Sequence, residues 1–385
     1  MENNLTMISG NNLGFLMGRS RTAREIIDFI KEGAMFRDFG YMMRQLRPAS
    51  DLTKILTQGL SDITGENYAS VSKKVRNWMN GKNVPKNRET IFRICFVLKL
   101  NEDEANLLTG RLSDMGIHYR DPSELAYAYA FRTGKNYTQA QELKKRAVAI
   151  ADEEAAGMAG PAPEVYTRQI KAAFSAVHTD EEFDLFFREN GAKLGTMHDS
   201  AYRKFIELLD DLQNPASYGG PEGLDRSYTL AEVIQEYMQL NVPVRQKKAS
   251  KAGNAAQTRD LDIYQKIVRK YWPSESTLIR MRNRVEDVDR KTMLLLYLAT
   301  ESFDDEIEEG DIDFLEDFED DPETLLEIRI ENMRIFLDEY GMNPLDPGNP
   351  FDFLLIYAMR TEEDEEARVR MEEVLDLLYS ESEEE

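Results

Sequence analysis

Cysteine and histidine are scarce in this 385-residue chain, which has one cysteine and three histidines. A single cysteine excludes a disulfide framework and any zinc site built on cysteine pairs, and it fits a reducing compartment. The histidines lie far apart, and none forms a pair at metal-binding spacing. Cys95 falls on the apolar side of a helical pattern, where we expect a small core residue. We therefore expect no metal and no cofactor.

Catalytic signatures are also missing. The sequence contains no nucleotide-binding loop and no Gly-x-Ser-x-Gly nucleophile motif. Residues 14–20, GFLMGRS, superficially resemble a phosphate loop, but the spacing is wrong, an arginine replaces the lysine, and no strand precedes them. Nothing in the spacing of the carboxylates favours an acid–base pair. The sequence predicts a protein that is not an enzyme.

Long apolar runs are absent as well. No run approaches the ~18 apolar residues that a membrane span requires, and the N-terminus lacks the basic-then-apolar pattern of a signal peptide. A cytoplasmic protein without a membrane partner is expected. At 42% hydrophobic residues, the chain is long enough for two or three cores. Strand signals are scarce and helical periodicity is nearly continuous, so we predict an all-α, multi-helical fold.

Charge is distributed very unevenly along the chain. The net charge is −23, yet residues 1–150 hold 23 basic and 16 acidic side chains, so the rest of the chain carries the acidic excess. Residues 66–99 hold eight basic side chains and only two acidic ones. Such asymmetry is expected when one region meets a polyanion and another region is kept away from it.

The basic region centres on Val71–Leu100, where the pattern predicts a short helix, a loop and a second helix. Ser72 is a suitable N-cap, and Val75 and Trp78 then share one helical face. Gly81 tolerates the left-handed conformation that ends a helix, and the proline four residues later prevents the helix from continuing. The pattern is typical of two helices that pack against each other around a basic surface.

The run Val-Ser-x-x-Val-x-x-Trp-x-x-Gly at 71–81, followed by a proline-containing loop and an amphipathic helix, resembles the lambda-repressor-like (XRE-type) helix-turn-helix family. The resemblance covers residues 52–108 and leaves the remainder unassigned. The family usually has a glycine directly before the Val-Ser pair, whereas Ser70 stands there and Gly65 lies further back. The resemblance implies a recognition helix over 72–80 that enters the major groove of double-stranded DNA.

The candidate DNA-binding residues are polar or basic: Ser72, Lys73, Lys74, Arg76, Asn77, Asn80, Lys82, Asn83 and Lys86. By position in the family, Ser72, Lys73 and Asn77 would face base edges, and the three from 80 to 83 would meet phosphates. The remaining three are included for their charge alone, because phosphate neutralisation needs Lys and Arg near the groove. The alternative is an ordinary solvated face on a helical domain that binds another protein.

Shifts in composition suggest domain boundaries. We predict an N-terminal helical segment over 1–50 and a helix-turn-helix domain with appended helices over 51–152. Residues 153–163, EEAAGMAGPAP, have the composition of a linker. An acidic helical domain is predicted over 164–385, in which one early helix is capped by Thr179 and begins with acidic residues.

Two segments of the acidic region repeat the pattern of the helix-turn-helix region in the same order. Aligning Arg290 with Arg88 places Asn283 at the position of Gly81 and brings two apolar helices into register. We interpret this match as an internal duplication, with a degenerate second helix-turn-helix in 228–300. It would give a second surface with these residues: Thr277, Arg280, Arg282 and Arg284.

A second pair of segments follows the same order, because Pro350–Arg360 has the spacing of Pro122–Arg132. Coincidence among leucine-rich helices is the alternative to duplication. Between the two repeated segments of the acidic region, residues 301–327 hold 15 acidic and no basic side chains, interleaved with phenylalanines. This segment is either a solubilising loop or a nucleic-acid mimic that covers a basic face. Residues 244–259 are basic without any acid and suit pairing with nucleic acid or with the acidic segments.

These features together predict a DNA-binding transcription regulator. Its acidic C-terminal region would sense, dimerise or autoinhibit, and would offer a surface to a protein partner. A homodimer is expected because one recognition helix rarely gives enough specificity. The alternative is a helical interaction protein on the same scaffold, in a phage or mobile-element setting, that does not bind DNA.

Overall fold

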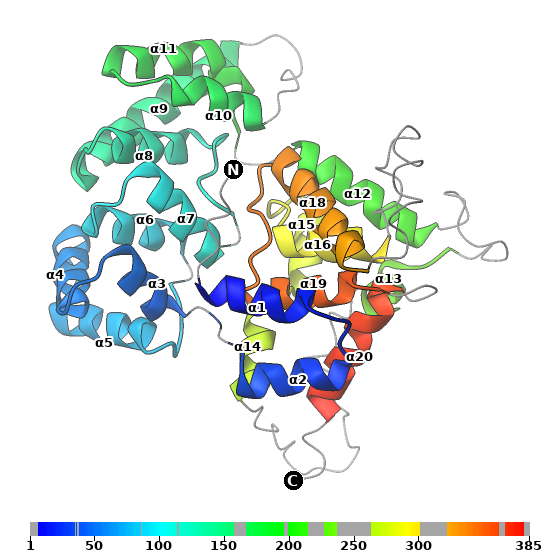
Figure 1. Cartoon of the computed structure of the whole chain (residues 1–385). Helices are drawn as coiled ribbons and strands as arrows, with labels where there is room; N and C mark the ends of the chain where they lie inside the picture. The colour runs from blue at the N-terminus through cyan, green and yellow to red at the C-terminus, as the bar shows by residue number, and fades with distance from the viewer. Residues whose placement is uncertain are drawn as a thin grey trace, which may run out of the picture. The chain divides into compact units, whose positions relative to one another are not determined.

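The computed structural model describes residues 7–34, 36, 38–85, 87–113, 115–157, 167–195, 199–214, 227–236, 263–300, 322–361 and 366–380 (Figure 1). Every regular element in these ranges is a helix, so the all-α prediction is confirmed. None of the helices in these ranges is both long enough and apolar enough to cross a membrane. The predicted acidic segment lies outside the described residues up to position 321, and the basic run at 244–259 lies outside them entirely.

The chain divides into two compact units. The first unit comprises Arg37–Ser200 with Leu337–Asn343, and the second comprises Met1–Phe36, Ala201–Phe336 and Pro344–Glu385. This division differs from the predicted one, because it cuts through the predicted 1–50 segment and groups residues 164–200 with the predicted helix-turn-helix region. The predicted linker is helical over its first five residues.

The helices of the first unit are α3 (Phe39–Leu46), α4 (Leu52–Thr64), α5 (Tyr68–Met79), α6 (Arg88–Val97), α7 (Glu102–Ser113), α8 (Pro122–Arg132), α9 (Tyr137–Gly157), α10 (Thr167–Ser175), α11 (Asp180–Asn190) and the short 3-10 helix η1 (Gly191–Lys193). Helix α8 is central to this unit, since Glu124–Phe131 are all buried. Cys95 is fully buried on α6, as predicted, and burial raises the pKa of its thiol. Thr179 caps α11 in a capping box with Glu182, which confirms the predicted helix start.

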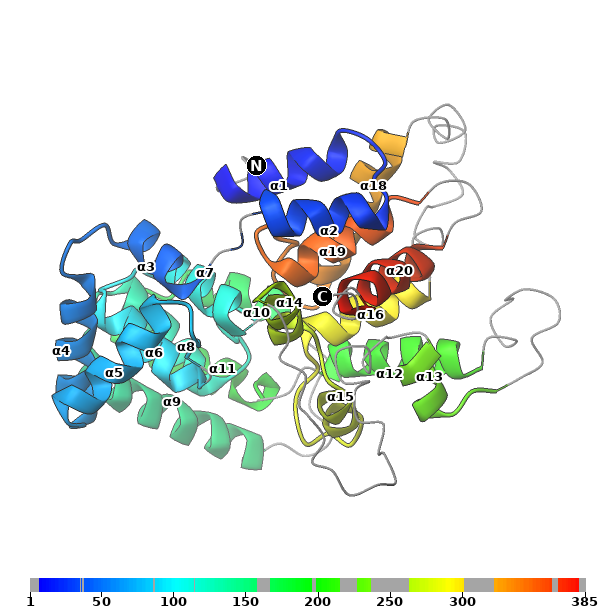
Figure 2. The same cartoon turned by 90° about the horizontal axis from the view of Figure 1, so that it is seen from below.

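The helices of the second unit are α1 (Met7–Met17), α2 (Ala23–Glu32), α12 (Asp199–Gln213), α13 (Leu230–Glu236), α14 (Ile263–Tyr271), α15 (Glu275–Arg282), α16 (Arg290–Ala299), α18 (Pro322–Glu339), α19 (Pro350–Met359) and α20 (Ala367–Ser380). The last three residues of α18 count with the first unit. Helices α1 and α2 lie against α19 and α20, although most of the chain separates them in sequence (Figure 2). All ten residues of α19 are buried, as expected for a central helix.

One helix of the first unit has a counterpart in the second unit with the same length and the same capping hydrogen bonds. Helices α6 and α16 each have ten residues, and they begin after Asn87 and Asp289. The side chains of these N-caps accept from the backbone N–H groups of Thr90 and Thr292. Both helices end in a C-cap whose N–H donates to two carbonyls of the last turn. The equal length and equal caps favour duplication over coincidence.

A pair formed by an arginine and a carboxylate repeats as well. Arg88, the first residue of α6, donates Nε to Glu124 Oε1 at 2.7 Å and Nη2 to Glu124 Oε2 at 2.6 Å. Arg290, the first residue of α16, donates Nη1 and Nη2 to the two oxygens of Asp352, both at 2.9 Å. Each carboxylate belongs to the third residue of a helix with proline at its first position. We call each pair a clamp.

The loop before each carboxylate also makes the same hydrogen bonds in both units. Arg88 Nη2 donates to the carbonyl eight residues before Glu124, at Gly116, and Arg290 Nη2 donates to the carbonyl eight residues before Asp352, at Pro344. The backbone N–H six residues before each carboxylate donates to that carboxylate, at 2.7 and 2.8 Å. Leucine-rich composition does not produce matched hydrogen bonds of this kind. The structure therefore supports an internal duplication.

In the second unit, the helices that correspond to α10 and α11 come from the N-terminal part of the chain. Arg132 at the end of α8 donates to the carbonyl of Phe174 in α10, and Arg360 at the end of α19 donates to the carbonyls of Leu16 and Met17 in α1. The next helix in each case, α11 or α2, opens with a Thr–Glu capping box. Helices α1 and α2 thus stand in the second unit where α10 and α11 stand in the first.

Candidate nucleic-acid interface

Helices α4 and α5 are joined by a three-residue turn. Gly65 ends α4 with a φ of 71°, a left-handed conformation that glycine adopts without a side-chain clash. Asn67 then caps α5, and its side chain accepts from the backbone N–H of Ala69 at 2.9 Å. The predicted helix-turn-helix motif has this order of helix, short turn and second helix.

The predicted start of the recognition helix is wrong. Helix α5 begins at Tyr68, so Ser72 lies inside the helix, half-buried, and is not its N-cap. The Val-Ser pair directed the prediction to position 72, whereas the local stop and cap signals are Gly65 and Asn67. The helix therefore has one more turn at its N-terminus than the sequence pattern predicted.

One side of α5 is held by the core of the first unit. Val71, Val75 and Trp78 are buried, and the Trp78 ring lies edge-on to Phe39 of α3 with 6.0 Å between the ring centroids. A Cβ added to Gly40 would come 2.3 Å from the carbonyl oxygen of Met79, so the two helices approach too closely for a side chain there. The core thus fixes which side of α5 faces outward.

The opposite side carries the basic residues. Ala69, Lys73, Arg76 and Asn80 follow one another at spacings of four, three and four, which places them on one helical face, and all four are exposed. Lys73 and Arg76 form no ion pair within the described part of the chain. We call these four residues the α5 face. Two cations one turn apart on an open surface are available to an anionic partner.

The other predicted residues differ in their setting. Lys74 lies at the side of α5 and its Nζ is 2.6 Å from Glu66 Oε2, so its charge is partly neutralised. Asn77 is half-buried. Asn83 is exposed in the loop after the helix, and Lys86 lies outside the described residues. The structure thus groups part of the predicted set and separates the rest from it.

The end of α5 brings Lys82 back toward the helix. Asn80 is the C-cap and Gly81 has a φ of 67°. The N–H of Lys82 donates to the carbonyl of Asn77 at 3.0 Å, and that of Gly81 to the carbonyl of Trp78 at 3.0 Å. These two bonds define a Schellman motif, which turns the chain at Gly81 and ends α5. The exposed basic surface therefore continues from the helix into the loop.

Three further exposed residues come from the earlier helix start. Asn67, Tyr68 and Ser70 stand at the N-terminal end of α5, and 46% of the Tyr68 surface is exposed. In helix-turn-helix proteins, residues at this end of the second helix reach base edges. Sequence reasoning missed them because it placed the helix start four residues too late. The glycine at 65 and the asparagine at 67 were the available signals.

The second unit has a matching helix pair in α14 and α15. A three-residue turn joins them, and Ser274 caps α15 by accepting from the N–H of Thr277. At the end of α15, Arg284 takes the left-handed conformation with a φ of 57° and donates to the carbonyl of Met281. Helix α15 has eight residues against twelve in α5.

The predicted register between these helices needs a one-residue correction. The cap hydrogen bonds place Asn283 at the position of Asn80 and Arg284 at that of Gly81, not Asn283 at that of Gly81. Buried Met281 then replaces Trp78. The loop before α16 is one residue shorter than the loop before α6. The sequence alignment left no gap in this loop and therefore shifted α15 by one residue.

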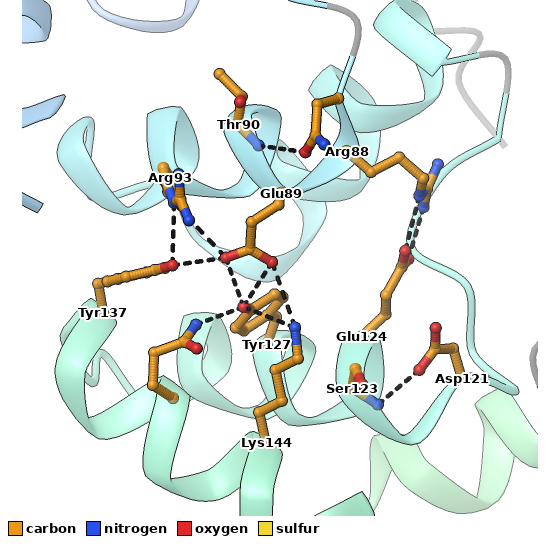
Figure 3. A network of polar contacts seen from close by, with 12 residues as sticks. Arg88, Glu89, Thr90, Arg93, Asp121, Ser123, Glu124, Tyr127, Tyr137 and Lys144 are labelled. Carbon is orange, nitrogen blue, oxygen red and sulfur yellow. Dashed lines mark hydrogen bonds and ion pairs between the residues drawn. The ribbon is translucent and has the colours of Figure 1, made fainter. Parts of the chain in front are cut away.

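A polar network lies at the start of α6 (Figure 3). Glu89 accepts from the hydroxyl of Tyr137 at 2.6 Å and from that of Tyr127 at 2.9 Å, and Lys144 Nζ lies 3.4 Å away. Burial raises the pKa of Glu89, but the hydrogen bonds from Tyr137 and Tyr127 outweigh this and hold the pKa below its usual value. The network joins α6 to α8 and α9, and its polar groups satisfy one another.

Comparison of the chain with protein-family models, with curated proteins and with solved structures gave no match. The helix-turn-helix prediction therefore rests on the sequence pattern and on the geometry of α4 and α5. Within the described residues, no group of three or more histidine, cysteine or acidic side chains is placed to hold a metal ion.

Proposed function

We propose that the protein is a DNA-binding regulator that places α5 in the major groove of double-stranded DNA. The observation that carries the proposal is the α5 face, where Lys73 and Arg76 stand exposed one turn apart on a helix whose other side is fixed in the core. A basic helix that follows a three-residue turn and is held rigidly by its neighbours suits groove binding.

The residues have different roles in this proposal. Asn67, Tyr68 and Ser70 stand at the N-terminal end of α5 and would read base edges, since this end enters the groove first. Arg76 and Lys82 are exposed at the other end and would contact phosphates. Lys73 lies between the two groups. Lys74 contributes less because Glu66 already pairs with it.

Binding of mixed-sequence duplex DNA by the full chain tests the proposal. At about 50 mM salt, where phosphate contacts are strong, fluorescence anisotropy should show saturable binding. Lys73→Ala/Arg76→Ala should weaken it at least tenfold. A matched control, Lys145→Ala/Arg168→Ala, removes the same charge from exposed sites on α9 and α10 and should leave the affinity within about twofold.

Selection from a random duplex library tests the base-reading part. One preferred sequence should be enriched, and Asn67→Ala/Ser70→Ala should change or broaden it without changing the salt dependence. No binding by the wild-type chain at low salt would overturn the proposal. Equal weakening by the two charge-removing pairs would also overturn it, because the attraction would then not depend on α5.

A further inference from the structure

The second unit preserves the helix pair but not its basic surface. With the cap hydrogen bonds as the guide, Ile279 stands where Arg76 stands and Val285 stands where Lys82 stands. Lys73 and Lys74 are replaced by Ser276 and Thr277. The scaffold of the motif is therefore retained in α15, and its polyanion-binding side chains are not.

The two replacements put apolar side chains at exposed positions near one helix end. Ile279 is 38% exposed and Val285 is 61% exposed. The N–H of Val285 donates to the carbonyl of Arg280 at 2.9 Å, and that of Arg284 to the carbonyl of Met281. In this Schellman motif the residue at Val285 commonly contacts the residue four positions inside the helix C-terminus, which is Ile279. Single exposed apolar residues are ordinary, but two held together at one helix end mark a contact surface.

Charges of both signs surround this apolar pair. Arg280 Nη2 lies 2.7 Å from Glu286 Oε1, and the side chains are 55% and 40% exposed. Arg282 and Glu275 are exposed on the same short helix. Glu275 and Glu286 place negative charge beside these arginines, which weakens the attraction for a polyanion. A symmetric contact between two identical surfaces needs both signs on each, because each arginine then meets the other copy's glutamate.

We propose that the face formed by Ile279, Val285, Arg280 and Glu286 is the homodimer interface, and that its occupant is the same face of a second copy of this chain. Ile279 and Val285 lie at the centre of this interface. Around them, Arg280 of each copy pairs with Glu286 of the other copy, as in other interfaces with an apolar core and a polar rim. The duplication thus assigned different partners to its two copies: nucleic acid to α5 and the second chain to α15.

Sedimentation equilibrium of the full chain without DNA tests this inference. The wild-type protein should associate at micromolar concentrations to twice its 44.4 kDa mass. Ile279→Glu/Val285→Glu, which changes exposed residues only, should reduce the mass to that of the monomer and raise the dimer dissociation constant at least tenfold. The control Ile335→Glu/Val369→Glu changes two other exposed apolar residues of this unit, at 51% and 44% exposure, and should leave the dimer intact.

A wild-type monomer at ~100 μM would overturn the inference, since stable dimers form well below that concentration. A dimer that survives Ile279→Glu/Val285→Glu, or one that the control disrupts equally, would overturn it too. Because no DNA is present, the outcome is independent of whether α5 binds DNA. Failure here would leave the proposed function standing, and failure of DNA binding would leave this interface standing.

Discussion

The two units of this protein keep the same clamp but expose different surfaces. In the first unit the side chains of Arg88 and Glu124 are 31% and 10% exposed, whereas in the second those of Arg290 and Asp352 are 4% and 2% exposed. The surface of α5 is basic, and that of α15 combines apolar residues with both charges. The comparison shows that the interactions inside a repeated unit persist while its exposed helix face changes.

The buried clamp gives the largest expected effect. Asp352→Ala leaves the guanidinium of Arg290 buried without its carboxylate, which costs about 3–5 kcal/mol of the free energy of unfolding. Glu124→Ala should cost less, about 1–3 kcal/mol, because nearly a third of Arg88 stays in water. If the two losses are equal, the difference in burial between the copies has no energetic consequence.

The two tryptophans allow each unit to be followed separately. Trp78 lies in the first unit and Trp272 in the second, and both are buried. Urea unfolding of Asp352→Ala should therefore be followed by fluorescence in a Trp78→Phe background, and that of Glu124→Ala in a Trp272→Phe background. Asp376→Ala, which removes an exposed carboxylate from α20, is the matched control and should change stability by less than about 0.5 kcal/mol.

The left-handed residue after each helix gives a smaller contrast. Gly81→Ala forces a side chain into a φ of 67°, which costs about 1–2 kcal/mol. Arg284→Gly removes the same strain but also the interaction of the Arg284 guanidinium with the Tyr202 ring, 4.2 Å from its centroid. The net change should lie within about 0.5 kcal/mol, because a cation–π interaction is of similar size. Thermal unfolding of the two variants measures both effects, and a strongly stabilising Arg284→Gly would show that the ring contributes nothing.

The Glu89 network belongs to the first unit alone, since Lys291 and Leu355 occupy the positions of Glu89 and Tyr127 in the second. The pKa of Glu89 is lower in the folded protein than in the unfolded chain, so its stabilisation is complete above the unfolded pKa and is lost as the pH falls through the folded pKa. Unfolding of the first unit should become easier between about pH 5 and pH 3. Glu89→Gln should flatten that dependence, and an unchanged pH profile would contradict the assignment.

The sequence predicted those features that depend on local signals. The cap at Thr179 and the apolar periodicity located helices correctly, because both signals lie within a few residues of the helix that they predict. The start of α5 was mispredicted because the family-like Val-Ser pair outweighed Gly65 and Asn67. The clamps could not be predicted, since Arg88 and Glu124 are 36 residues apart and only tertiary packing brings them together.

The predicted register between α5 and α15 was wrong for a related reason. Aligning Arg290 with Arg88 also pairs Met281 with Met79, which fits by residue type, but the cap hydrogen bonds give Met281 the position of Trp78. A one-residue difference in a loop cannot be placed from residue types when both helices are apolar on one side. The cap hydrogen bonds place it, and only with that register do Ile279 and Val285 align with Arg76 and Lys82.

The salt dependence of DNA affinity tests the central claim most directly. The claim is that α5, and not α15, meets the phosphates. Lys73→Ala/Arg76→Ala/Lys82→Ala should reduce the slope of log affinity against log salt by about 2–3, since each phosphate that the variant no longer neutralises lowers it by about 0.9. Arg282→Ala, at an exposed position of α15 outside the proposed dimer face, should leave the slope unchanged. An unchanged slope for the α5 variant, or an equal reduction for both variants, would contradict the account.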